Sequence, residues 1–186
     1  MKPNFSSFPL YIFFILFFSS FIYVPIEASN LIEETCKRCA QNDPNVKYGF
    51  CKTSLQAAPA SQYASLEGLG SISIKLLGYN VTDTSYHIKH LLKNKKWDKY
   101  YLQRLNDCYE LYSDAINTVK QAMNSYHDKR YDDANIQISA ILDDSNTCED
   151  GFKEGGNGKS SPLSKRNENS FELGATSLCI LMNMKG

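Results

Sequence analysis

The chain of 186 residues has no net charge, because 20 lysine and arginine residues balance 20 aspartate and glutamate residues. A neutral chain has no general attraction for nucleic acid or for an anionic membrane, so both are disfavoured as partners. The sequence also lacks long runs of alternating β-branched residues, and strand signals are weak throughout. These absences favour an all-helical protein whose partner is neither nucleic acid nor a membrane.

Sequence motifs of catalysis and metal binding are missing as well. Neither a Gly-x-Ser-x-Gly elbow nor a His-Glu-x-x-His pair occurs. The segment GKS at 158–160 resembles the end of a phosphate-binding loop, but Lys153 stands where that loop needs its first glycine. His87 and His90 share a helix face without an obvious third ligand. We therefore expect no enzymatic activity, no cofactor and no metal ion.

Only the N-terminus contains a long apolar run. Lys2 precedes an almost wholly apolar stretch from Leu10 to Val24, and Ala28 is a small residue suited to a cleavage site. This is the layout of a secretory signal peptide. The run is about 15 residues long, whereas a membrane-spanning helix needs roughly 20, and an uncleaved anchor is the alternative. We expect residues 1–28 to be removed and residues 29–186 to be exported as one domain.

Four later segments have the periodicity of amphipathic helices. Residues 99–127 are the clearest, since their apolar positions recur in alternating steps of four and three. Residues 131–152 repeat the pattern, and residues 64–94 and 163–184 follow it less regularly. The spacing predicts an antiparallel four-helix bundle with short loops. In the two less regular segments, the expected core positions include Leu66, Leu69, Ile72, Leu76, Tyr79 and Tyr86, and then Phe171, Ala175, Leu178 and Met182.

A small helical hairpin is expected ahead of the bundle. Residues 29–60 contain two short apolar segments around a polar turn, and residues 61–186 form the bundle. A hairpin of this size buries too little surface to hold itself closed. A Cys36–Cys51 bridge would close a loop of about 15 residues and stabilise the hairpin by about 3 kcal/mol. The spacing also permits a bridge from Cys39 to Cys51.

Of the remaining cysteines, Cys108 and Cys148 are expected to lie next to each other, whereas Cys39 and Cys179 have no expected position relative to each other. All six cysteines lie in the exported part, and an even number in an oxidising compartment indicates disulfides. Cys108 and Cys148 fall on the apolar seams of neighbouring predicted helices, so they are well placed to bond. Cys179 lies one residue off the predicted stripe of the last helix. It is either a buried free thiol or the partner of Cys39 in a third bridge.

Three groups of residues resemble motifs of the plant invertase and pectin methylesterase inhibitor family. The segment LNDCYELYSDA at 105–115 resembles the family's signature helix, and SAIL at 139–142 with TCEDGF at 147–152 forms the second match. The overall pattern is most similar to the pollen members described as invertase inhibitors. The third match, to the family's N-terminal hairpin, consists of Thr35, Cys36, Pro44, Cys51, Ser54 and Leu55.

The resemblance has consequences for the fold. It implies a four-helix bundle preceded by a helical hairpin. It also implies two disulfides, Cys36–Cys51 and Cys108–Cys148. The other two cysteines have no place in the family pattern, so both alternatives for them stay open.

The resemblance also implies a mode of action. Family members bind one target enzyme in a 1:1 complex and block its substrate cleft, the target being an acid invertase or a pectin methylesterase. The invertase inhibitors carry a Pro-Lys-Phe segment at the turn before the third bundle helix. The basic residues retained here could pair with catalytic carboxylates of a target. The matching segment, without the proline and with tyrosine in place of phenylalanine, is Asp128, Lys129, Arg130 and Tyr131.

Invertase is the first expectation for the target and pectin methylesterase the second, because inhibitors of the latter often have tyrosine at that last position. A non-inhibitory binding bundle, such as a pollen allergen of the same fold, is a further alternative. The expected destination is the extracellular space or cell wall, with the vacuole as the alternative. The sequence Asn80-Val81-Thr82 fits an N-glycosylation acceptor, so we expect a glycan on Asn80 if its side chain faces outward.

Overall fold

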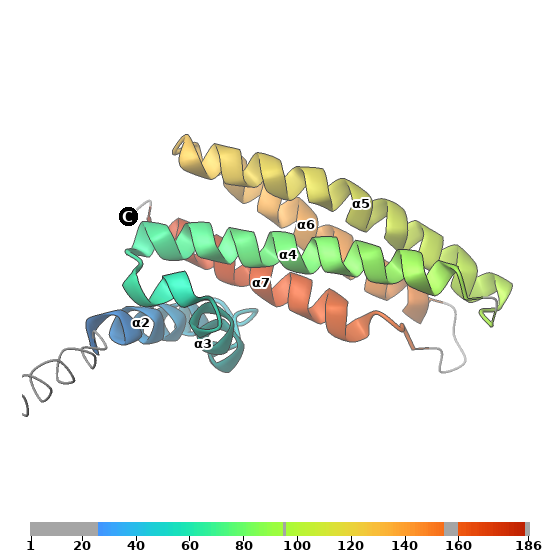
Figure 1. Cartoon of the computed structure of the whole chain (residues 1–186), viewed down its shortest axis with the longest axis horizontal. Helices are drawn as coiled ribbons and strands as arrows, with labels where there is room; N and C mark the ends of the chain where they lie inside the picture. The colour runs from blue at the N-terminus through green and yellow to red at the C-terminus, as the bar shows by residue number, and fades with distance from the viewer. Residues whose placement is uncertain (1–25, 95, 155–159, 185–186) are drawn as a thin grey trace, which may run out of the picture.

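The computed structural model describes residues 26–94, 96–154 and 160–184, and every regular element in these ranges is helical. Four long helices pack as an antiparallel bundle in which each contacts two neighbours, in the order α4, α5, α6, α7 and back to α4 (Figure 1). The predicted all-α bundle is confirmed. No helix of the described ranges has the length and apolar character needed to cross a bilayer. The bundle helices are α4 (Leu66–Leu92), α5 (Lys99–His127), α6 (Tyr131–Lys153) and α7 (Ser164–Met182).

The two central helices, α5 and α6, begin and end close to their predicted bounds because their apolar periodicity is regular. The Asp98 side chain caps α5 by accepting a hydrogen bond from the Tyr101 amide at 2.9 Å. Tyr101 itself is only half-buried, whereas the rest of the predicted stripe faces the core. The buried residues of these helices are Leu105, Cys108, Tyr112, Ala115, Val119, Ala122, Ser125 and Tyr126, and then Ala134, Ile138, Ile141, Ser145, Cys148 and Phe152.

The predicted inward face of α4 is wrong at two positions. Tyr79 and Tyr86 point outward and are 71% and 69% exposed. Small residues fill much of the inward face instead, because they allow neighbouring helices to approach closely. At Gly70, an added Cβ would collide with the Tyr126 hydroxyl. The buried positions of α4 are Leu69, Gly70, Ser73, Ile74, Leu77, Val81, Thr84, Ser85 and Ile88.

The predicted stripe of α7 is also partly wrong. Met182 is 64% exposed, and Phe171 and Leu178 are half-buried. This helix contacts α4, α6 and the N-terminal hairpin, so residues around most of its circumference are buried and a single stripe does not describe it. Ser164 is the first residue of α7, and Leu163 precedes it as the N-cap residue.

The N-terminal hairpin consists of α2 (Ile26–Asn42), α3 (Tyr48–Gln56) and the short 3₁₀-helix η2 (Pro59–Tyr63). It packs against α7 and the beginning of α4 at one end of the bundle (Figure 1). The polar turn between α2 and α3 is stabilised by the Asp43 carboxylate, which accepts a hydrogen bond from the Asn45 amide at 2.8 Å.

Three disulfides connect the six cysteines. Cys36–Cys51 joins α2 to α3, and Cys108–Cys148 joins α5 to α6, as the family resemblance implied. The third disulfide, Cys39–Cys179, connects the hairpin to α7, so neither thiol is free. The hairpin is therefore covalently attached to the last helix of the bundle.

Candidate functional site

The candidate site is the turn that connects α5 to α6. The α5 helix ends in a Schellman motif, in which the Lys129 amide donates to the Tyr126 carbonyl at 3.0 Å and the Arg130 amide donates to the Ser125 carbonyl at 2.8 Å. Both helices are held in the bundle on either side, so the turn has little freedom to move. It projects as a short, rigid tip at one end of the molecule (Figure 1).

Lys129 has an unusual backbone conformation at this tip. Its φ is 59°, and it is the only described residue other than glycine with a positive φ. The Schellman motif requires the left-handed conformation at this position, where glycine is the usual residue. A non-glycine residue there costs about 1 kcal/mol of strain. The side chain is exposed, and no ion pair of its ammonium group occurs within the described part of the chain.

Arg130 contrasts with Lys129 because its charge is already paired within the turn. Its guanidinium donates to the Asp133 carboxylate at 2.5 Å and to the Asp128 carboxylate at 3.2 Å. These hydrogen bonds raise the pKa of the Arg130 guanidinium above its usual value. All three side chains are exposed, so the pairs add little stability. Their effect is to hold the first turn of α6 against the end of α5.

Tyr131 forms the base of the tip. Its ring packs against the ring of Tyr126, with centroids 5.6 Å apart. The Tyr126 hydroxyl donates to the Glu67 carbonyl at 2.7 Å, which ties the end of α5 to the start of α4. Burial raises the pKa of the Tyr126 phenol, so it remains a neutral donor. Tyr131 is thus half-buried on a fixed support and presents only part of its ring to solvent.

The four predicted residues therefore lie together but have different surroundings. Asp128 and Arg130 neutralise each other, Tyr131 packs inward, and Lys129 carries the one cation of the turn that has no counter-ion among the described residues. An exposed, unpaired ammonium group on a conformationally fixed turn is suited to enter an acidic cavity of another molecule.

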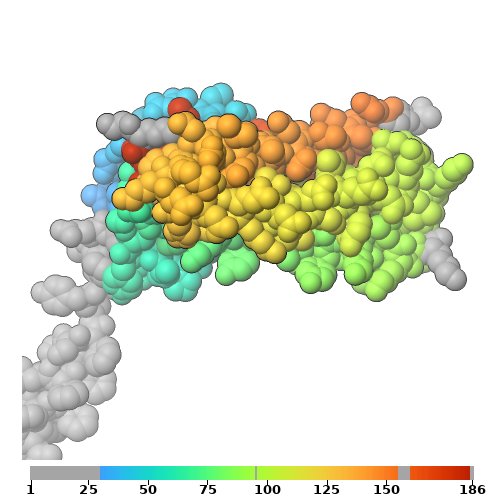
Figure 2. Space-filling view, turned by 90° about the horizontal axis from the view of Figure 1, so that it is seen from above, coloured from blue at the N-terminus to red at the C-terminus, as the bar shows by residue number. Residues whose placement is uncertain are grey.

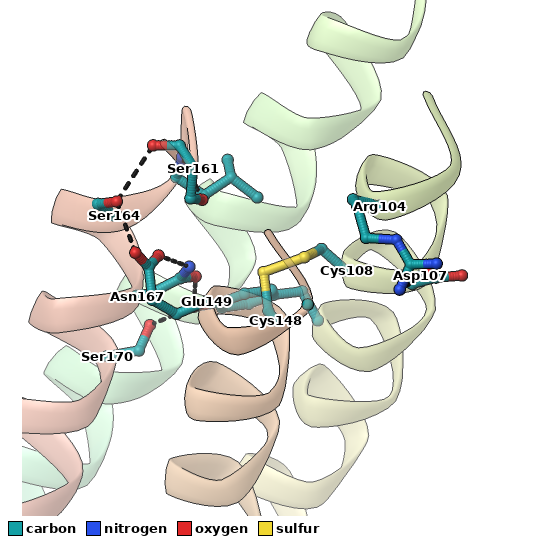
Figure 3. The surroundings of a disulfide bond; sticks show 12 residues. Arg104, Asp107, Cys108, Cys148, Glu149, Ser161, Ser164, Asn167 and Ser170 are labelled. Carbon is teal, nitrogen blue, oxygen red and sulfur yellow. Dashed lines mark hydrogen bonds and ion pairs between the residues drawn. A yellow bond between two sulfur atoms is a disulfide. The ribbon is translucent and has the colours of Figure 1, made fainter. Parts of the chain in front are cut away.

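The other end of α5 and α6 has the opposite charge. A groove of about 600 Å³ lies over the Cys108–Cys148 disulfide, near Arg104 and Asp107 in Figure 3. Figure 2 shows the face that α5 and α6 share, in yellow and orange, between this end and the tip. The sequence analysis missed this groove. Its charged lining residues are Arg104, Asp107, Glu110, Asp114, Asp150 and Glu154.

A polar network lies beside this disulfide, and Figure 3 shows its residues Glu149, Asn167 and Ser170. The Tyr112 hydroxyl of α5 lies 2.8 Å from Asn167 Oδ1 and 3.1 Å from Ser170 Oγ, both on α7. Asn167 Nδ2 in turn donates to Glu149 Oε2 of α6 at 2.8 Å. Apolar periodicity places Tyr112 in the core but does not identify its polar partners Asn167 and Ser170.

The expected glycan on Asn80 conflicts with this network. Ser170 Oγ donates to Asn80 Oδ1 at 2.5 Å, so the half-buried Asn80 side chain faces α7. The outward orientation that the prediction required is not the one observed. A glycan on the amide nitrogen of Asn80 would have to fit beside this contact with α7 in the folded protein.

Within the described ranges, no cluster of three His, Cys, Asp or Glu residues has an arrangement that could hold a metal ion. What the geometry does provide is a rigid tip with one unpaired ammonium group, on a bundle with an acidic groove at its other end. These features favour a protein that acts by contact with another macromolecule.

Comparison with known proteins identifies the class more closely. The family model described as "Plant invertase/pectin methylesterase inhibitor" matches residues 30–180, and the chain belongs to this family. A "Putative invertase inhibitor" of Platanus orientalis is 44% identical over 165 residues, covering 89% of this chain and 95% of the relative. "Pectinesterase inhibitor 12" of Arabidopsis thaliana is 33% identical over 158 residues, covering 84% of this chain and 88% of the relative.

Solved structures agree with the fold. The crystal structure of a pectin methylesterase inhibitor from Arabidopsis thaliana aligns with a TM-score of 0.59 at 20% identity, covering 80% of this chain and 94% of that one. A mutant form of such an inhibitor from Arabidopsis aligns with a TM-score of 0.63, covering 73% of this chain and 88% of that one. The family and the named relatives are inhibitors, and the chain is accordingly not an enzyme.

Proposed function

We propose that this chain is a secreted inhibitor that binds an acid invertase in a 1:1 complex and blocks its substrate cleft. The relatives named invertase inhibitors in Platanus orientalis and Platanus acerifolia, at 44% and 42% identity over most of the chain, support invertase as the target. The fold alone would not support this choice, because function depends on the contact surface.

The observation that carries the proposal is the exposed, uncompensated ammonium group of Lys129 at the rigid α5–α6 tip. Glycoside hydrolases use a pair of carboxylates at the bond that they cleave. An ammonium group that enters the cleft would pair with these carboxylates and exclude the sugar. Because the backbone of the tip is fixed before binding, little conformational entropy is lost in the complex.

Pectin methylesterase is the second candidate target. Relatives named pectinesterase inhibitors, from Arabidopsis thaliana and Actinidia deliciosa, are 33% and 34% identical. The tip favours neither target by itself, because it lacks proline and ends in Tyr131.

The proposal includes the processing and destination of the chain. Residues 1–28 are a signal peptide, and residues 29–186 are the inhibitor domain, with the hairpin at 29–60 and the bundle at 61–186. Members of the family act outside the cell, in the wall or in the vacuole, and one relative is named "Cell wall / vacuolar inhibitor of fructosidase 2". We propose export to the cell wall for this chain.

Parallel titration tests the target. The oxidised protein is added to an acid invertase and to a pectin methylesterase at mildly acidic pH, and residual activity is measured against molar ratio. We expect loss of invertase activity near a 1:1 ratio and co-elution of the complex on a sizing column. If only pectin methylesterase loses activity, the target is pectin methylesterase and not invertase. If neither enzyme loses activity, the remaining alternative is that the chain is a non-inhibitory binding bundle.

The role of the tip is tested by Lys129→Ala. The left-handed backbone conformation strains alanine and lysine to a similar extent, so the melting temperature should stay unchanged. The inhibition constant should rise by more than roughly tenfold, because the ammonium group is lost. Lys120→Ala removes an exposed lysine from the C-terminal half of α5, outside the turn, and is the matched control. Unchanged inhibition by Lys129→Ala would exclude the tip as the contact site.

A further inference from the structure

The outer face of α4 carries two exposed aromatic rings that the core does not use. Tyr79 and Tyr86 are 71% and 69% exposed, and α4 lies at the front of the molecule in Figure 1 with no described element across it. Neither hydroxyl makes a hydrogen bond and neither ring contacts another aromatic ring within the described ranges. Tyrosine offers a large contact area at low entropic cost, so an exposed pair on a rigid helix is a ready contact surface.

Lysine residues bracket the two rings along the same line of the helix. Positions 75 and 93 are about five full turns apart, so Lys75 and Lys93 lie at the same angle around α4, and both tyrosines fall within about 40° of that angle. Lys75 and Lys93 are exposed, and neither forms an ion pair within the described part of the chain. We call Lys75, Tyr79, Tyr86 and Lys93 the α4 stripe.

The α4 stripe is positively charged although the whole chain is neutral. Lys89 is also exposed on its edge. Between positions 75 and 93 of the chain the only carboxylate is Asp83, and it is paired with Arg166 of α7, so it does not offset the lysines. The stripe therefore presents aromatic rings between cations over a straight length of about 27 Å.

We infer that the α4 stripe binds a linear acidic polysaccharide, a chain of uronate sugars. The electron-rich face of a tyrosine ring attracts the polarised C–H groups on the flat side of a pyranose ring. Each ammonium group pairs with a sugar carboxylate. The two rings are about 10 Å apart along the helix, so an extended sugar chain that runs along α4 meets one lysine, then both rings, and then the other lysine.

Other occupants fit the stripe less well. Lysine is depleted at protein–protein interfaces, and the stripe has no apolar centre of the kind that such interfaces bury. It also lacks the leucine, phenylalanine or tryptophan residues with which interfacial helices enter a membrane. Single-stranded nucleic acid would use similar rings and cations, but the proposed destination of the chain is the cell wall, so an oligonucleotide serves as the competing ligand in the experiment.

This inference goes beyond the proposed inhibition. The stripe shares no residue with the α5–α6 tip, so binding of a polysaccharide would hold the protein in the wall without occupying the surface proposed for the target enzyme. Either function could fail without the other.

The experiment measures binding of the secreted, oxidised protein to polygalacturonate by isothermal titration calorimetry. Neutral dextran and a single-stranded DNA oligonucleotide serve as comparison ligands. We expect binding to polygalacturonate that weakens as salt rises, and none to dextran. The double variant Tyr79→Ala/Tyr86→Ala should raise the dissociation constant at least about tenfold. The variant Lys75→Gln/Lys93→Gln should weaken binding and reduce its salt dependence.

Matched variants separate the stripe from a general effect of composition. Tyr63 is 75% exposed and lies in η2, so Tyr63→Ala should not change the affinity. Lys37→Gln/Lys120→Gln removes the same charge from exposed positions of α2 and α5 and should leave most of the binding. Equal losses in the stripe and control variants would overturn the inference. So would binding to dextran with similar affinity, or tighter binding to the oligonucleotide than to polygalacturonate.

Discussion

The N-terminal hairpin and the four-helix bundle are stabilised by different means. The bundle buries one continuous apolar cluster along helices of 19 to 29 residues, and only the Cys108–Cys148 disulfide lies wholly within it. The hairpin has helices of 17 and 9 residues, and its cluster contains two disulfides, Cys36–Cys51 and Cys39–Cys179. An ionic clamp between the hairpin and α7 supplements them, in which Lys47 contacts Glu168 at 2.7 Å and Glu172 at 2.5 Å.

The difference follows from surface area. Long helices bury enough apolar surface to offset their conformational entropy, whereas two short helices do not. Disulfide bonds therefore hold the hairpin in its position, whereas apolar packing holds the bundle helices in theirs. If inhibition requires the hairpin as well as the tip, the disulfide that attaches it to α7 is a requirement for function and not only for stability.

The largest expected effect is that of removing this attachment. In Cys39→Ser/Cys179→Ser, a bridge that spans 140 residues is lost, and the free energy of unfolding should fall by about 4 kcal/mol. The hairpin should also open locally before the bundle unfolds. Hydrogen exchange measured by mass spectrometry should show faster exchange in α2 and α3, while fluorescence of the only tryptophan, Trp97, reports the bundle.

Cys108→Ser/Cys148→Ser is the matched comparison, because it removes a bridge within the bundle and leaves the hairpin attached. In that variant, the hydrogen-exchange rates of α2 and α3, compared with those of the bundle helices, should be the same as in the wild type. Equal exchange of hairpin and bundle in both variants would contradict the division into two differently stabilised regions.

A smaller effect is expected from the polar network of the bundle. Tyr112→Phe removes the hydroxyl next to Asn167 and Ser170 and leaves their buried oxygen atoms with fewer partners. The free energy of unfolding should fall by about 2 kcal/mol in chemical denaturation, without any change in hairpin exchange. Tyr109→Phe, at a half-buried position of the same helix, is the control. A loss of hairpin protection in Tyr112→Phe would show that the two regions are coupled through α7.

The helices could be predicted from the sequence more fully than their buried faces. Residues 99–127 and 131–152 were expected, and α5 and α6 are observed at Lys99–His127 and Tyr131–Lys153, because an uninterrupted apolar period identifies a helix and its core face together. In α4, the close approach of helices selects glycine, serine and threonine for the interior. A count of apolar residues therefore assigned Tyr79 and Tyr86 to the wrong side.

The candidate site was found through the family motif and not through periodicity. The left-handed backbone of Lys129 had no local signal, since neither glycine nor asparagine occupies the position. The sequence could not show whether Lys129 or Arg130 is the better candidate for contact with a target. Only the structure shows that the charge of Arg130 is already paired. The Cys39–Cys179 bridge stayed open for a similar reason, as it joins segments far apart in the sequence whose packing no pattern specifies.

The smallest expected effect concerns pH, and the two regions should respond with opposite sign. In the hairpin clamp, hydrogen bonds from Lys47 and then Lys165 lower the pKa of Glu168 from 4.5 to about 2. A depressed carboxyl pKa stabilises the folded state above pH 4.5, and this contribution is lost as the pH falls toward 2. In the bundle, burial, and next the nearby Asp114 and Asp143 carboxylates, raise the pKa of Asp144 from 3.8 to about 6. A raised carboxyl pKa destabilises the folded state above pH 6, and that cost disappears as the pH falls from 6 toward 3.8.

Acidification from pH 7 to about 4.5 should therefore stabilise the bundle while the clamp stays intact, and further acidification should loosen the hairpin first. Asp144→Asn should raise the free energy of unfolding by less than about 1 kcal/mol at pH 7, because solvent screens the half-buried group, and should have no effect near pH 4. Glu168→Gln should remove the low-pH change in hairpin cleavage by pepsin. Thermal melts across the whole range, and timed pepsin digestion below pH 4.5, measure the two responses separately. Bundle melting and hairpin cleavage that shift together in both variants would contradict this expectation. The hairpin would then be held by its packing on α7 as firmly as the bundle helices are held, and its disulfide would add stability without defining a separate region.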